Sequence, residues 1–144
     1  MTGLFYTLPY STVGLFAGML SKSKKRVAIL AGLTMLVSSL HAVNGITSSF
    51  FAICAMRFLH GAFSSVINPL TFSVVADYFP PDKRGTANAL LSTGTFFGVA
   101  LSSITIILIK AMGWRMTYGI MGMLGLITAL LTAGMKNPQK DPAQ

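Results

Sequence analysis

Long apolar stretches, separated by short charged or turn-forming segments, restrict the fold of this sequence more than any other feature. Only 10% of the 144 residues are charged, against roughly a quarter in soluble domains. A soluble chain of this size would leave about a third of its surface in water, and so few charges could not cover that surface. The sequence therefore excludes a soluble globular domain and predicts an integral membrane protein.

The apolar stretches are long enough to cross a bilayer as helices. Crossing about 30 Å of hydrocarbon takes about 20 helical residues. We expect spans at about residues 3–20, 27–43, 49–79, 86–109 and 116–135, followed by a polar tail, 136–144, on the cytoplasmic side. The third stretch is longer than a span needs and contains Pro69, so it should tilt, kink or project from the bilayer. The predicted fold class is an all-α integral membrane protein with one bundle of five transmembrane helices.

Basic residues are distributed unequally between the two sides that alternating spans create. One side has only Lys110 and Arg115, and the positive-inside rule makes the richer side cytoplasmic and places the N-terminus outside. This distribution explains the net charge of +8 without nucleic acid, because no basic stripe with interleaved aromatic residues lies outside these short loops. The richer side holds Lys22, Lys24, Lys25, Arg26, Lys83, Arg84, Lys136 and Lys140.

Polar residues inside two of the stretches mark candidate functional faces. At about 100° per residue, six residues of the third stretch fall within one stripe roughly 100° wide. Asn88, Ser92 and Thr95 form a similar face on the fourth stretch. Because polar side chains are costly in lipid, these faces should meet protein or water, as in a substrate pathway. The stripe on the third stretch comprises Arg57, His60, Gly61, Ser64, Asn68 and Thr71.

Each of these residues also has a structural interpretation. Ser64 and Asn68 could simply hydrogen-bond a neighbouring helix. His60 could relay protons or be a neutral hydrogen-bonded residue, and His41 is a weaker candidate. Arg57 could snorkel toward the outer interface, because it lies only a few turns into its span. An arginine that stays inside the membrane requires a carboxylate, a substrate anion or water, and the predicted spans offer no buried acid to pair with it, so its partner must come from elsewhere.

Other sequence signals are structural or absent. Glycines at helical spacing predict close helix packing in the first, fourth and fifth stretches. The sequence has no nucleophile elbow, no phosphate-binding Gly-Lys-Ser/Thr loop, no His-Glu-x-x-His and no pair of carboxylates within a span. We therefore predict no enzyme activity, no metal site and no cofactor. The glycines are Gly14, Gly18, Gly94, Gly98, Gly119, Gly122 and Gly125.

Two segments resemble the major facilitator superfamily: residues 57–61, Arg-Phe-Leu-His-Gly, and residues 76–87, Ala-Asp-Tyr-Phe-Pro-Pro-Asp-Lys-Arg-Gly-Thr-Ala. In that family the fourth helix carries Arg-x-x-x-Gly, then an acidic residue, an aromatic-Pro turn and an Arg-Gly. Residues 113–115, Gly-Trp-Arg, are similar to the segment that precedes the family's sixth helix. The five spans would then be helices two to six of an incomplete N-terminal bundle. The Asp-Tyr-Phe-Pro-Pro loop is similar to the spinster-like and organic-anion branches.

One loop departs from the family pattern. The loop after the family's second helix usually reads Gly-x-x-x-Asp-Arg-x-Gly-Arg-Arg. Gly18 and Arg26 match it, but Lys22 occupies the acidic position and Lys25 the second glycine. A cation at Lys22 cannot pair with Arg as the carboxylate would, although Asp77 could pair with Lys22, Lys24 or Arg26.

The resemblance implies a secondary transporter, or a fragment of one, that moves a small organic solute by alternating access between two bundles. Arg57 would neutralise an anionic substrate or a proton-carrying carboxylate, and Asn68 and Asn88 would offer hydrogen bonds. The alternative is a transporter-derived subunit that no longer transports and packs into a larger membrane complex. The expected partners are the lipid bilayer, a small solute, and a second bundle or other membrane subunits. The predicted pathway is Arg57, His60, Ser64, Asn68, Asn88 and Ser92, and the predicted cytoplasmic gate is Lys22, Arg26, Asp77 and Arg84.

Overall fold

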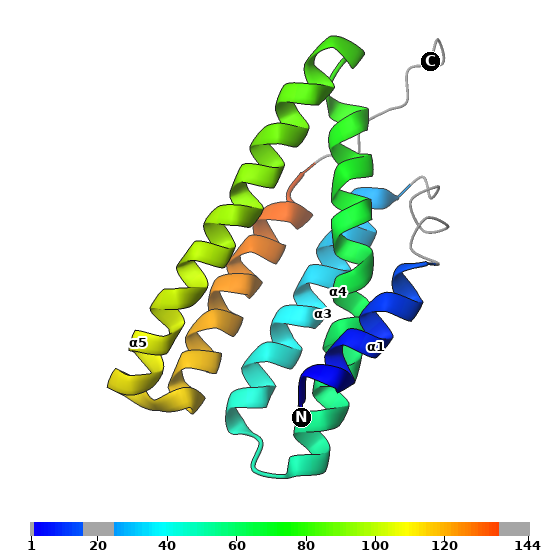
Figure 1. Cartoon of the computed structure of the whole chain (residues 1–144). Coiled ribbons are helices and arrows are strands. Elements are labelled where there is room, and N and C mark those ends of the chain that lie inside the picture. The colour runs from blue at the N-terminus through cyan, green and yellow to red at the C-terminus, as the bar shows by residue number, and fades with distance from the viewer. Residues whose placement is uncertain (1, 16–24, 136–144) are drawn as a thin grey trace.

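The computed structural model describes residues 2–15 and 25–135, and every regular element within these ranges is an α-helix. The elements are α1 (Thr2–Gly14), α3 (Arg26–Ile46), α4 (Phe50–Tyr78) and α5 (Pro81–Ala133). The all-α fold class is therefore confirmed. The predicted fourth and fifth helices are the two arms of α5, which are separated by the non-helical Gly113 and lie antiparallel (Figure 1). The end of the first predicted span, residues 16–20, and the predicted tail lie outside the described residues.

Two short backbone signals set the start of α5 and the chain reversal within it. Phe79 and Pro80 are extended, as the proline that follows each residue favours, and Pro81 starts the helix at a position where no amide hydrogen is needed. Gly113 reverses the chain with φ 80° and ψ 161°, a conformation that only glycine adopts without strain. Residues 81–112 are called the first arm and residues 114–133 the second arm.

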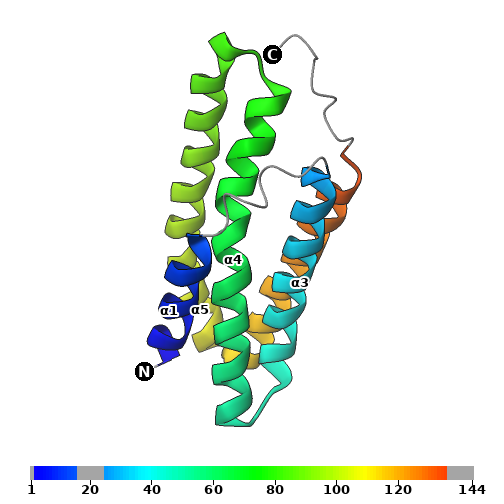
Figure 2. The ribbon, with the colours of Figure 1, turned by 90° about the vertical axis from the view of Figure 1, so that its right-hand side faces the viewer.

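Helix α4 lies between α1 and α3, as Figures 1 and 2 both show. On one side α4 packs against α1, and on the other it packs against α3 through a small apolar core. Leu70 at the centre of this core is fully buried. The core comprises Val27, Leu30, Leu70 and Val74.

Much of the apolar surface faces outward. Three helices, α3, α4 and α5, are long and apolar enough to cross a membrane. The buried residues of α5 all belong to its second arm, so the first arm presents its large side chains to the outside. In water such a surface would drive aggregation, whereas in a bilayer it meets lipid or another membrane helix. The exposed side chains of the first arm include Leu90, Phe96, Phe97, Val99, Ile106 and Ile107.

Small residues allow α3 to approach the second arm of α5 closely. A Cβ atom on Gly122 would lie 2.7 Å from the backbone nitrogen of Ala42, and one on Gly125 would collide with Ser38. A Cβ atom on Gly45 would lie 2.7 Å from the carbonyl oxygen of Arg115. The predicted close packing is therefore confirmed for Gly122 and Gly125.

The other predicted glycine contacts are looser. A Cβ on Gly14 would make ordinary contact with Ser65 at 3.7 Å, and Gly18 lies outside the described residues. Cβ atoms on Gly94, Gly98 and Gly119 would meet no described atom within 4 Å, although the Gly119 backbone nitrogen would lie 3.4 Å from a Cβ on Gly45. Close packing at Gly94 and Gly98 finds no neighbour in the part of the chain that the structure describes and stays a prediction. Gly94 and Gly98 are exposed, whereas Gly119 is half-buried, because periodicity identifies a thin helix face but not which neighbour covers it.

Gly119 and Gly122 make a matched test of this packing. Gly122→Ala should lower the free energy of unfolding by about 1–3 kcal/mol, because the new methyl group overlaps Ala42. Gly119→Ala should leave the free energy of unfolding unchanged or raise it by up to about 1 kcal/mol, because it fills open space with a better helix former. Unfolding in mixed SDS micelles, followed by circular dichroism, measures both variants, and equal effects would contradict the packing described here.

Candidate functional site

Histidine and aromatic side chains from four helical segments meet inside the bundle. The rings of His41 on α3 and His60 on α4 lie 4.9 Å apart between centroids. Tyr6 of α1 lies 5.5 Å from His60, and Tyr118 of the second arm of α5 lies 5.2 Å from His41. Together with Arg57, these residues are called the His41 cluster.

Arg57 is the charged member of the His41 cluster. Its guanidinium donates a hydrogen bond to the Tyr118 hydroxyl and lies 5.5 Å from the centre of the Tyr118 ring. The Nε atom of Arg57 is buried and has no hydrogen-bond partner among the described residues. No carboxylate of residues 2–15 and 25–135 forms an ion pair with Arg57. The contact is thus a tyrosine of the predicted fifth span, and the partner expected from outside the spans has no counterpart among the described residues.

A small cavity adjoins this cluster. Its volume is about 130 Å³, and both arms of α5 contribute to its wall. Thr105 of the first arm and Thr117 of the second arm add hydroxyl groups to a wall that is otherwise partly apolar. The cavity has room for about four waters or for one small polar group of a solute. It is lined by His41, Arg57, Thr105, Ile109, Thr117, Tyr118 and Met121.

A second pocket is lined by polar residues from the second half of α4. It has a volume of about 270 Å³ and lies between α4 and the first arm of α5, with Asn68 and Ser92 in its wall. The Asn68 amide donates to the Tyr10 hydroxyl at 3.5 Å. Ser64 is half-buried, and the amide oxygen of Asn88 is buried without a partner among the described residues.

The six predicted pathway residues are therefore divided rather than continuous. Arg57 and His60 belong to the His41 cluster, whereas Asn68 and Ser92 share the second pocket. Gly61, which the same stripe contains, serves packing instead: a Cβ there would collide with the Tyr6 carbonyl oxygen of α1. The pathway role of these residues remains a prediction.

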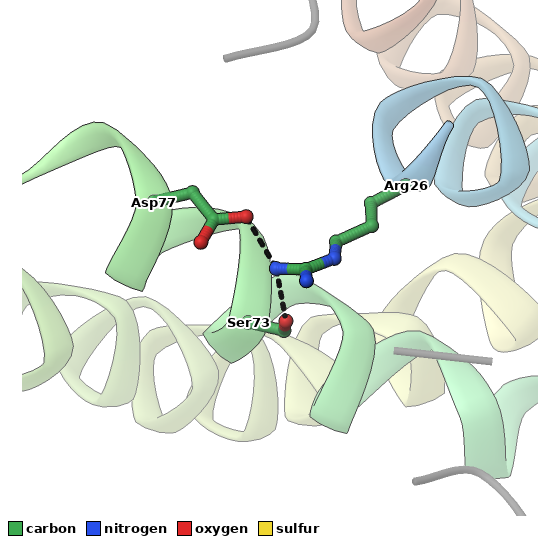
Figure 3. Close-up of polar contacts among 3 residues, drawn as sticks. All are labelled: Arg26, Ser73 and Asp77. Atoms are coloured by element: carbon green, nitrogen blue, oxygen red, sulfur yellow. Dashed lines mark hydrogen bonds and ion pairs between the residues drawn. The ribbon is translucent and has the colours of Figure 1, made fainter. Parts of the chain in front are cut away.

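The opposite end of α4 carries an ion pair. Arg26 at the start of α3 binds Asp77 near the end of α4, and the same guanidinium nitrogen lies 3.0 Å from the Ser73 hydroxyl oxygen (Figure 3). The Arg26 and Asp77 side chains are only 14% and 21% exposed. Of the three cations considered as partners for Asp77, the structure places Arg26 on it, while Lys22 and Lys24 lie outside the described residues.

The remaining gate residue binds backbone. Arg84 donates from Nε to the Phe79 carbonyl oxygen at 3.1 Å, which ties the start of α5 to the end of α4. The Arg26–Asp77 pair likewise joins two helices of the same bundle. The gate role predicted for Lys22, Arg26, Asp77 and Arg84 stays a prediction, but these contacts also stabilise the bundle itself.

The structure adds Tyr6 and Tyr118 to the predicted residues and places His41, the weaker candidate in the sequence, beside His60. A usable signal existed for His41: it and Arg57 both lie within about ten residues of the connection between α3 and α4, so antiparallel packing brings them to a similar depth. No sequence signal identified Tyr6 or Tyr118, because their contacts depend on how α1 and α5 pack.

The whole chain, residues 1–144, matches the family model described as Major Facilitator Superfamily. The chain belongs to this superfamily. Its fold, its multi-pass membrane character and its sequence motifs agree with that membership.

Curated relatives are named as transporters. The chain is 35% identical to the "Probable galactarate/D-glucarate transporter GarP" of Escherichia coli (strain K12), over 60% of this chain and 20% of the relative. It is 28% identical to the "Probable L-galactonate transporter" of the same strain, over 95% of this chain and 35% of the relative. The chain thus spans about a fifth to a third of the length of these relatives.

Solved structures support the fold. A bacterial homolog of the human lysosomal transporter Spinster, crystallised in an inward-facing and occupied conformation, matches with a TM-score of 0.74 at 22% identity. That match covers 96% of this chain and 37% of the other. The inward-facing and unoccupied form matches with a TM-score of 0.69 at 23% identity, covering 97% and 34%.

The Arg26–Asp77 pair leads to a stability prediction. Asp77→Asn should lower the free energy of unfolding by about 1–2 kcal/mol, because it leaves a partly buried guanidinium without its carboxylate. The loss should fall at the lower part of the usual range for charged hydrogen bonds, since both side chains retain some contact with water.

Two variants control this measurement. Asp82→Asn removes an exposed acid from the first turn of α5 and should change the free energy of unfolding by less than about 1 kcal/mol. Adding Asp77→Asn to an Arg26→Gln background should have a smaller effect than in the native chain. An equal loss in both backgrounds, measured by SDS titration, would show that the pair does not couple α3 to α4.

Proposed function

We propose that this chain forms part of a secondary transporter for small organic anions and works by alternating access against a second helical bundle. The observation that carries the proposal is Arg57: a cation inside a membrane bundle, beside a cavity, with no carboxylate partner among the described residues. Placing an arginine inside a membrane costs free energy, so we expect its charge to bind an anion during function.

The chemistry of the cavity suits a carboxylate. Arg57 offers charged N–H donors, and Tyr118 and Thr105 add hydroxyl donors around the same space, whereas the Thr117 hydroxyl already donates to the Gly113 carbonyl oxygen. The Tyr118 hydroxyl already accepts a hydrogen bond from Arg57, so its own hydrogen remains available to an incoming oxygen. The cavity is too small for a whole sugar acid, so only its charged end would enter, while the rest extends toward the second pocket or a facing bundle.

The relatives agree with this substrate class. Galactarate, D-glucarate and L-galactonate are named as the solutes of proteins similar to this chain, and all three are hydroxylated carboxylates. A carboxylate would satisfy Arg57, whereas hydroxyl groups along the same solute would suit the amides of Asn68 and Asn88.

Alternating access needs a second bundle to move against. The outward-facing apolar side chains of the first arm of α5 provide a surface that fits either lipid or such a bundle. The Arg26–Asp77 pair would keep α3 and α4 together while the bundle rotates as a rigid body. A subunit that no longer transports would share the same surface, and it is distinguished by whether it binds a solute.

Binding of D-glucarate to the purified chain in lipid nanodiscs tests the proposal. We expect measurable calorimetric binding of D-glucarate and none of neutral D-glucose. Arg57→Gln should weaken D-glucarate binding at least about tenfold, equivalent to about 1.4 kcal/mol, because it removes the charge but keeps a polar side chain.

Arg115→Gln is the matched control. Arg115 stacks 4.4 Å from the Trp114 ring centre and donates to the Ser48 hydroxyl at 3.3 Å, outside the His41 cluster. Its replacement should leave D-glucarate affinity unchanged. Equal losses in the two variants would indicate nonspecific attraction to positive charge, and absence of D-glucarate binding in the native chain would favour the non-transporting subunit.

A further inference from the structure

We propose that an open groove between the end of α4 and the first arm of α5 binds one anionic phospholipid of the cytoplasmic leaflet. An acyl chain lies in the groove in this proposal, and the lipid phosphate binds at Lys83. The groove shares no residue with the cavity beside Arg57. The lipid site is therefore separate from the proposed anion site and does not depend on which solute the chain binds.

The groove is large and almost entirely apolar. Its volume is about 530 Å³, which exceeds both pockets described above and lies within the range of about 300–1,000 Å³ for ligand sites. Thr95 contributes the one hydroxyl group of its wall. An occupant must therefore be mostly apolar. The groove, called the Phe79 groove, is lined by Val75, Phe79, Ala87, Leu90, Leu91, Gly94 and Thr95.

The lining residues of the first arm give the groove its direction. Ala87, Leu91 and Gly94 follow one another at intervals of three or four residues, so they form one face of the helix over about 10 Å of its length. A Cβ atom on Gly94 would meet nothing within 4 Å, so the wall leaves open space at this position. Acyl chains and membrane-spanning helices both run across the leaflet, so an acyl chain fits a groove of this direction.

A basic turn lies at one end of the Phe79 groove. Lys83 is exposed in the first turn of α5, four residues before Ala87 and therefore on the same helix face as the groove. Arg84 donates from Nε to the carbonyl oxygen of Phe79, which itself lines the groove, so a second cation is held beside the same end. Asp82 shares this turn, and residues 82–84 together keep a net charge of +1. This end of the groove therefore attracts anions.

The position of this turn matches the depth of lipid headgroups. Tyr78 ends α4 directly before the turn and is 40% exposed, and tyrosine is enriched at the level of the headgroups. The positive-inside rule puts the same turn on the cytoplasmic side, where the leaflet carries anionic lipids. Lys83 thus lies at the depth of the phosphates, and the groove extends from there into the acyl region.

Two other occupants complement the Phe79 groove less well. A helix of a second bundle would fill the apolar part, but it would cover Lys83 with apolar surface unless it carried an acid at that level. A second copy of this chain, paired by two-fold symmetry, would bring its own Lys83 and Arg84 against the first pair, and like charges repel. An anionic phospholipid supplies an apolar chain and a negative charge in one molecule.

Native mass spectrometry of the full chain in detergent micelles tests the proposal with two lipids that have the same acyl chains. We expect one dioleoyl phosphatidylglycerol per chain, bound about fivefold more tightly than dioleoyl phosphatidylcholine, because a net charge of +1 near the headgroup favours the anionic lipid by about that factor. Lys83→Gln should abolish this preference. Lys110→Gln is the matched control, because Lys110 is an exposed cation near the opposite end of the first arm, and it should retain the preference.

Gly94→Leu tests the groove separately from the charge. A leucine side chain there would occupy the open space, so the affinity for both lipids should fall at least about tenfold. Gly98→Leu is the matched control, because a Cβ atom on Gly98 also meets nothing within 4 Å but Gly98 lines none of the three pockets, and it should leave the affinity unchanged. Glycerol 3-phosphate, a headgroup without acyl chains, should not displace phosphatidylglycerol.

Three results would overturn the proposal. The first is equal binding of the two lipids, or a preference that Lys110→Gln lowers as much as Lys83→Gln does. The second is lipid binding that Gly94→Leu leaves unchanged, which would indicate attraction to charge without the groove. The third is a lipid-free dimer that Gly94→Leu abolishes, which would mean that a second copy occupies the groove. None of these measurements involves D-glucarate, so the proposed function is tested independently.

Discussion

Close backbone approach at small residues is the interaction on which the rest of this structure depends. Inside a bilayer, lipid tails are as apolar as leucine side chains, so burying apolar surface gains little and helices associate through tight van der Waals contact. Gly61 admits the α1 backbone at Tyr6, and Gly122 and Gly125 admit α3 at Ala42 and Ser38. Because these contacts leave no room for a Cβ atom, they fix which residues of neighbouring helices lie at the same level.

The polar cluster is a direct product of that packing. Gly61 follows His60, so the contact that seats α1 also brings Tyr6 beside the His60 ring. A Cβ atom on Gly45 would lie 3.2 Å from the Tyr118 Cβ, so the contact between α3 and α5 also places Tyr118 near His41, one helical turn earlier. The glycine contacts that hold the helices together thus also position the residues of the His41 cluster. A substitution that shifts one of these helix contacts would therefore also move the side chains of the cluster.

The sequence predicted those features that depend on one helix at a time. Apolar length and charge spacing indicated the membrane class and the helical fold, and the loop motif at residues 76–87 indicated the superfamily. Periodicity grouped Arg57 with His60 correctly but also drew Gly61 and Asn68 into one functional stripe. The structure divides that stripe among an α1 contact, the His41 cluster and a separate pocket. Periodicity describes the direction of a side chain around its own axis, whereas its partner depends on the register of the neighbouring helix.

The uneven burial of α5 affects what holds each of its two arms in the membrane. The residues of α5 that the bundle buries all lie after Gly113, so the earlier arm has few buried contacts within the part of the chain that the structure describes. The earlier arm therefore depends on lipid, or on a neighbour outside the described residues, to cover its apolar side chains. The later arm is instead anchored by its glycine contacts with α3, so the reversal at Gly113 joins a segment that the bundle holds to one that its surroundings hold.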